Sequence, residues 1–98
     1  MIKYTKAFQK KLEDIFDEGG YSVRYEKGNF NSGYCILEAK RVVVINKFHS
    51  DEAKINSLVE ILGLVNLNWE TVSAESKKLF EELKGITMEL FSEKENYL

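Results

Sequence analysis

The sequence predicts a single α+β domain over residues 1–98: a helix, a three-stranded mainly antiparallel sheet, then two helices packed on the sheet. Three observations lead to this prediction. Apolar residues recur at helical spacing between residues 4 and 16 and again after residue 50. Residues 21–47 instead show the period of two that is typical of strands. A chain of 98 residues, 44% hydrophobic and 31% charged, has the length and composition of one globular domain.

The first predicted helix ends at Gly19-Gly20, a pair that can adopt the left-handed conformations common after a helix. Lysines near its start and acids near its end oppose the helix dipole, so packing must stabilise this helix. Its apolar stripe consists of Tyr4, Phe8, Leu12, Ile15 and Phe16.

Three strands are predicted at Tyr21 to Glu26, Tyr34 to Glu38 and Arg41 to Lys47. A turn with glycine at both ends, Gly28 to Gly33, joins the first two. Ala39-Lys40 is short enough for a tight hairpin between the second and third. The third strand is apolar on both faces from Val42 to Ile45, which predicts that it lies in the centre of the sheet.

The second helix begins near Ser50, a good N-cap residue followed by two acids, and it ends before Asn66 to Asn68. The last helix starts between Asn68 and Ser73. Its apolar spacing keeps phase across Gly85, which predicts one continuous helix. One core is expected to contain Val42, Val44, Ile55, Leu58, Leu62, Leu79 and Leu83.

Several classes of protein are excluded by composition. No apolar run approaches the roughly 20 residues that span a bilayer, and the N-terminus lacks the apolar core of a signal peptide, so we expect a soluble cytoplasmic protein with no membrane contact. Cys35 is the only cysteine; inside a strand it should be buried and unreactive. With His49 as the only histidine, a zinc ligand set is missing, and we expect no metal, no cofactor and no catalytic residues.

The middle of the chain is mildly basic. Residues 21–47 have five Lys or Arg and two acids, whereas residues 48–98 have five Lys and ten acids. The candidate binding surface is Arg24, Lys27, Phe30, Lys40 and Arg41. If Tyr21, Tyr25 and Tyr34 are exposed beside these residues, the bases of a single-stranded nucleic acid can stack on their rings. We favour the alternative that the tyrosines pack against the helices, because the net charge is −2.

The segment YEKGNFNSGYCILEAKRVVVINK resembles small uncharacterised bacterial proteins that share its glycine loop, hairpin and following helix. Residues 21–63 also resemble the core of zincin-type metallopeptidases, in which such a hairpin precedes the helix with the H-E-x-x-H motif. Two histidines on one helix face bind Zn²⁺ there, and the glutamate between them activates water. Val59 and Gly63 occupy the histidine positions here, and only Glu60 remains. The resemblance therefore implies a degenerate, metal-free core.

The sequence thus favours a non-catalytic interaction or structural module with an unknown protein partner. The alternative is a single-stranded nucleic-acid-binding module that uses the basic aromatic sheet. A homodimer is also expected, because the last helix has a longer apolar stripe than a small sheet and two helices can cover. The predicted interface is the C-terminal part of this helix, with Ile86, Leu90 and Phe91.

Overall fold

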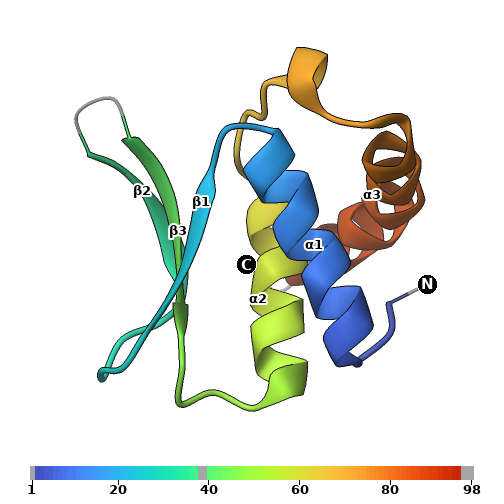
Figure 1. The fold of residues 1–98 in the computed structure, drawn as a ribbon. Coiled ribbons are helices and arrows are strands. Elements are labelled where there is room, and N and C mark those ends of the chain that lie inside the picture. The colour runs from blue at the N-terminus through green and yellow to red at the C-terminus, as the bar shows by residue number, and fades with distance from the viewer. Residues whose placement is uncertain (1, 38–39, 96–98) are drawn as a thin grey trace.

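The computed structural model describes residues 2–37 and 40–95, with side chains described for residues 2–34 and 40–84. The elements in chain order (Figure 1) are α1 (Lys6–Glu18), β1 (Ser22–Glu26), β2 (Gly33–Leu37), β3 (Lys40–Asn46), α2 (Asp51–Leu62), the 3-10 turn η1 (Trp69–Thr71) and α3 (Ala74–Glu95). The α+β class is confirmed, and each strand lies within one residue of its predicted bounds. The prediction that α3 continues through Gly85 is also confirmed.

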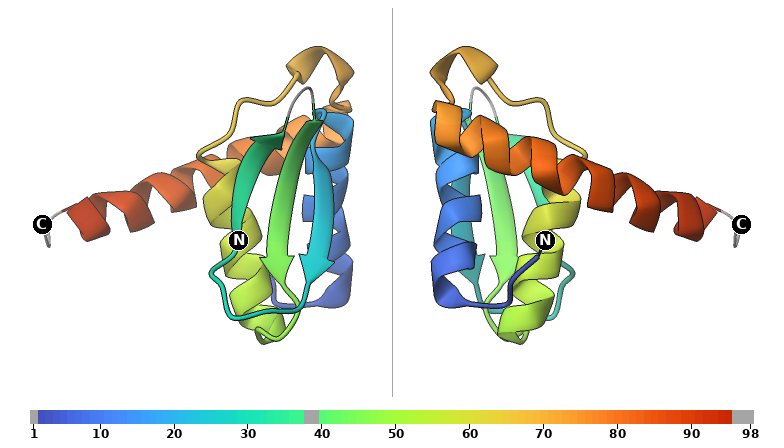
Figure 2. Two further views of the ribbon diagram at one scale, coloured as in Figure 1. Left: turned by 90° about the vertical axis from the view of Figure 1, so that its left-hand side faces the viewer. Right: turned by 90° about the vertical axis from the view of Figure 1, so that its right-hand side faces the viewer.

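β3 is the central strand, as predicted, but the sheet is mixed rather than mainly antiparallel. β3 pairs parallel with β1, with Arg24 opposite Val44, and antiparallel with β2, with Tyr34 opposite Val43. The reason lies in the connection after β1. Residues 27–32 pass beneath the end of β3 (Figure 2, left), so that β3 fits between β1 and β2. Both β1 and β2 are therefore edge strands.

The helices form two layers on one side of the sheet. α1 and α2 cover one face, and α3 packs on the other side of these two helices, away from the sheet (Figure 1). The predicted arrangement differs in this respect, because it placed both α2 and α3 against the sheet. The radius of gyration of 13.3 Å is that of one domain of this length. None of the described helices is long and apolar enough to cross a membrane.

The predicted core faces of the two later helices are confirmed. Leu79 is half-buried against the core, and four other predicted residues are buried in it: Ile55, Leu58, Leu62 and Leu83. These residues meet a core face of α1 that was also predicted. It includes Phe8, Leu12, Ile15 and Phe16.

In β3 the predicted core face is wrong by one residue. Val43 and Ile45 face the helices and join the core cluster, whereas Val42, which is also buried, and Val44 lie on the opposite face of the sheet. Because both faces of this strand are apolar, alternation of polarity could not fix which face the helices cover.

The two glycines after α1 have different roles. Gly20 adopts the left-handed φ of 95° that the sequence predicted. Gly19 does not; its φ is −86°, but a Cβ atom there would lie 2.8 Å from Leu67 Cδ2. The segment before α3 is thus packed closely on the end of α1. Three hydrogen bonds hold it there, from Asn68 N to Gly19 O (2.9 Å), from Ser73 N to Glu18 Oε1 (2.8 Å) and from Thr71 Oγ1 to Glu18 O.

Candidate functional site

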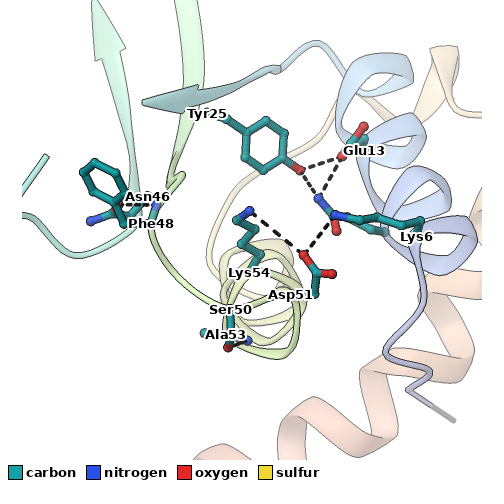
Figure 3. A network of polar contacts seen from close by, with 10 residues as sticks. Lys6, Glu13, Tyr25, Asn46, Phe48, Ser50, Asp51, Ala53 and Lys54 are labelled. Atoms are coloured by element: carbon teal, nitrogen blue, oxygen red, sulfur yellow. Dashed lines mark hydrogen bonds and ion pairs between the residues drawn. The ribbon is translucent and has the colours of Figure 1, made fainter. Parts of the chain in front are cut away.

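The three tyrosines that distinguish the two functional interpretations do not form one exposed surface. Tyr21 is 4% exposed and belongs to the core. Tyr25 is half-buried; its hydroxyl donates a hydrogen bond to Glu13 (Figure 3) and accepts one from Gln9 Nε2 at 2.9 Å. Burial, with the hydrogen bond to Glu13, raises the pKa of Tyr25. Tyr34 is 46% exposed, so a single ring of the three is open to solvent.

The candidate binding surface is divided between the two ends of the sheet. Lys27 and Phe30 lie in the loop after β1, whereas Lys40 and Arg41 begin β3 at the opposite end, about 20 Å away along a strand of seven residues. Arg24 lies between them on β1. Each of the two arginines has a local contact: Arg24 Nε lies 3.5 Å from Glu26 Oε1, and the Arg41 guanidinium lies 5.9 Å from the centre of the Tyr21 ring. These residues are therefore separate rather than one basic patch.

A groove runs between β2 and α2, and the sequence analysis did not predict it. Its volume is about 530 Å³, and its lining residues are Asn31, Ser32, Gly33, Tyr34, His49, Ser57, Glu60, Ile61 and Leu64. Leu64 is 54% exposed, so both this side chain and Tyr34 present apolar surface in the groove. An adjoining hollow shares Asn31 and His49 and includes Phe48, which is 70% exposed. The two depressions together make one continuous surface, which we call the β2 groove.

Asn46, the last residue of β3, builds one rim of the β2 groove. Its side chain is buried, and Nδ2 donates to the carbonyl oxygens of Gly28 (2.9 Å) and Phe30 (2.7 Å). Its Oδ1 accepts from Phe48 N at 2.9 Å (Figure 3), and its backbone N donates to Ser32 Oγ at 2.9 Å. One residue thus ties the loop before β2 to the loop after β3, where it holds the backbone of the exposed Phe48.

The two edges of the sheet differ in charge. An edge strand has a row of unpaired backbone N–H and C=O groups, and proteins usually protect such edges with charged residues, proline or bulges. β1 has the exposed charged residues Arg24 and Glu26, whereas β2, with the sequence GYCIL, has neither a charge nor a proline. β2 therefore has neither a charge nor a proline of its own to protect this edge, and the groove lies directly beside it.

The positions of the metallopeptidase motif do not gather into a metal centre. Val59 is 3% exposed and belongs to the core, Gly63 caps the end of α2, and Glu60 lines the β2 groove. Within the described residues, no three His, Cys, Asp or Glu side chains lie together in a way that could hold a metal ion. His49, the one histidine of the sequence, lines the same groove.

Four residues for which the sequence analysis predicts a side-chain role lie where side chains are not described. The first is Cys35, whose backbone pairs with Val42 in the sheet. The others belong to the C-terminal part of α3: Ile86, Leu90 and Phe91. The expectations for these four side chains stay predictions.

Comparison of the chain with protein-family models, with curated proteins and with solved structures found no match. The functional argument therefore depends on the surface itself. The sequence signal that could have pointed to this surface is the uncharged run GYCIL, which is unusual for an edge strand. The bonds from Asn46 to the loop before β2 have no comparable local signal, because those partners are 14 to 18 residues away along the chain.

Proposed function

We propose that this domain is a non-catalytic interaction module that binds an extended segment of a partner protein as a fourth strand, added to the free edge of β2. The observation that carries the proposal is the uncharged edge of β2 beside the groove. Strand addition of this kind takes affinity from backbone hydrogen bonds and specificity from pockets for alternate side chains. The edge of β2 offers the backbone hydrogen-bonding groups, and the β2 groove offers the pockets for side chains.

The lining of the groove indicates which segments would bind. Alternate side chains of an added strand would point to the face of the sheet that α2 covers, where Tyr34, Ile61 and Leu64 present apolar surface. Among the described residues that line the groove, Glu60 is the one with an acidic side chain. A segment with apolar residues at alternate positions would therefore fit best.

The resemblance to a metallopeptidase core agrees with this proposal, because a metal-free remnant of a peptidase would keep a surface for extended polypeptide. The nucleic-acid alternative is weaker. It needs stacked, exposed rings beside a basic patch, whereas Tyr21 is buried and the hydroxyl of Tyr25 is bonded to α1. The proposal also includes a cytoplasmic location, and a homodimer formed through the C-terminal part of α3.

Selection of random peptides displayed on phage, with the purified domain as bait, tests the proposal. The strongest peptide is then synthesised and titrated into wild type and into two groove variants, Tyr34→Lys and Leu64→Lys. Both side chains are about half exposed, so the lysines should not disturb folding. We expect each groove variant to bind at least about tenfold more weakly, because a charge then opposes an apolar contact.

Tyr4→Lys is the matched control, because Tyr4 is also 47% exposed but does not line the groove. Amide hydrogen exchange measured with and without peptide locates the contact, and we expect slower exchange in β2 and not in β1. Peptides that bind all four proteins equally and leave β2 unprotected would contradict the proposal. Tight, salt-dependent binding of a single-stranded oligodeoxythymidine that Lys40→Glu abolishes would support the alternative instead.

A further inference from the structure

Gly33, the first residue of β2, is a glycine that the fold of the described chain does not require. Its φ lies outside the left-handed region, since Gly20 is the one described glycine with a positive φ. Apart from the chain neighbours of Gly33, no described atom would lie within 4 Å of a Cβ atom added there, whereas at Gly19 such an atom would lie 2.8 Å from Leu67. Glycine in a strand often marks a place where a ligand or another backbone approaches closely.

The position of Gly33 is on the face of the sheet that the helices do not cover. Gly33 pairs with Val44 of β3, and Val44 pairs with Arg24 of β1, so these three residues form one row across the sheet. Val44 points away from the helices, and residues directly opposite one another share a face. Figure 2 (left) shows this face in front of the helices, with no described helix over it.

The row leaves an apolar side chain partly open to solvent. Val44 is half-buried, whereas Val42, on the same face of β3, is 7% exposed. On the β1 side of Val44 lies Arg24, whose side chain is 63% exposed. On the β2 side lies Gly33, which has no side chain with which to cover Val44. The row is therefore open toward the free edge of β2.

We propose that Gly33 determines which partner segments bind, by accepting an aromatic side chain of the added strand. The inference rests on the proposed function, because the aromatic residue belongs to the fourth strand. The residue of that strand opposite Gly33 points to the uncovered face, and its ring lies across Gly33 and covers Val44. Aromatic side chains placed across from a glycine at the edge of a sheet stabilise strand pairing in this way.

The spacing of strands favours a ring over a smaller side chain. Neighbouring strands lie about 4.8 Å apart, so the backbone of β3 at Val44 is about 10 Å from the added strand. Alanine or valine on the added strand would leave Val44 open, whereas a flat ring can lie on the bare backbone of Gly33 and reach Val44. The face of the ring also attracts the guanidinium group of Arg24 from the other side.

The same pairing sets the order of residues in the partner segment. Successive side chains of a strand point to opposite faces, so the residue next to the aromatic one points into the β2 groove beside Tyr34. We therefore expect peptides selected on this domain to share an aromatic residue directly next to an apolar residue. The first contacts Gly33 and Val44, and the second contacts the groove.

Gly33→Val tests the inference, with the strongest peptide selected on wild type as the probe. Valine suits a strand and meets no described atom at its Cβ, so the urea midpoint should stay unchanged or rise. The new side chain occupies the space of the ring, so we expect binding at least about tenfold weaker. Ser22→Val is the matched control, because Ser22 is exposed and its partner Val42 places it on the same face at the β1 edge.

Replacing the aromatic residue of the peptide with alanine completes a double-mutant cycle. This change should weaken binding to wild type about tenfold, and Gly33→Val should then alter the affinity for the alanine peptide less than about twofold. Ser22→Val should leave the affinity of both peptides unchanged.

Three results would overturn the inference. Selected peptides might share no aromatic position, Gly33→Val might lower the urea midpoint, which would mean that the fold itself requires the glycine, or Gly33→Val might bind the aromatic peptide like wild type. If Tyr34→Lys and Leu64→Lys still weaken binding in these cases, the proposed function stands without the inference. Peptides that leave β2 unprotected from amide exchange would overturn both.

Discussion

Replacing Asn46 with alanine tests whether one side chain fixes the rim of the β2 groove. The Asn46 side chain is 3% exposed, and its amide makes three hydrogen bonds, two to the carbonyl oxygens of Gly28 and Phe30 and one from Phe48 N. Each such bond contributes about 0.5–1.5 kcal/mol net, and a buried group left without a partner adds to the cost. We therefore expect the free energy of unfolding to fall by about 2–4 kcal/mol.

Urea unfolding followed by circular dichroism measures this loss, with the slope of the transition unchanged if the native state stays compact. The midpoint of thermal unfolding should fall by roughly 4–8 °C for each kcal/mol lost. The matched control is Asn29→Ala in the same loop. Asn29 is exposed, so its replacement should change the free energy of unfolding by less than about 0.5 kcal/mol.

Asn46→Asp sharpens the test, because aspartate keeps the acceptor for Phe48 N but loses the amide donor. At neutral pH its carboxylate would face the carbonyl oxygens of Gly28 and Phe30, which is unfavourable in a buried position. The aspartate variant should therefore be at least as unstable as the alanine variant. A loss of less than about half a kcal/mol for both variants would refute the role assigned to Asn46.

Three further predictions concern the core, an acidic group and a close contact. Leu58→Ala and Leu83→Ala should each lower the free energy of unfolding by about 2–5 kcal/mol, since both residues are buried. Losses near zero in a denaturant titration would show that these residues do not belong to the core. The backbone N–H just before α3 donates a hydrogen bond to the Glu18 carboxylate, which lowers the pKa of Glu18. The ionised carboxylate therefore stabilises the fold at pH values above the ordinary pKa of glutamate. This stabilisation is lost as the pH falls through the lowered pKa. Glu18→Gln should flatten that part of the stability curve, and an NMR titration showing an ordinary or raised pKa would contradict the assignment. Gly19→Ala should cost about 1–3 kcal/mol, and Leu67→Ala should cost less in that background than alone; additive losses in a double-mutant cycle would rule out their contact.

Local signals in the sequence were sufficient for the secondary structure. Ser50 caps α2, where its Oγ accepts a hydrogen bond from Ala53 N, and Gly20 has the positive φ expected after α1. The run from Val42 to Ile45 also identified the central strand correctly. In each case the residue type itself requires the observed conformation or position, so no distant contact is needed for the inference.

The arrangement of these elements could not be predicted in the same way. The parallel pairing of β1 with β3 depends on a loop that passes beneath β3, and that loop is held by Asn46 across a separation of 14 to 18 residues. The face of β3 that meets the helices is not encoded in a strand that is apolar on both sides. The position of α3 on the outer side of α1 and α2 likewise results from packing between helices rather than from its own pattern.

The exposure of β2 follows from the same choice of strand order, and that choice bears on function. An uncharged strand such as GYCIL would by itself be expected in the middle of a sheet. In a simple antiparallel sheet with β2 in the centre, β3 would form the edge, and its Lys40 and Arg41 would protect that edge. The observed order does the opposite, since it buries β3 and leaves the uncharged strand free. A domain that only needed to avoid association would be expected to have the protected edge, so the strand order itself supports binding at β2.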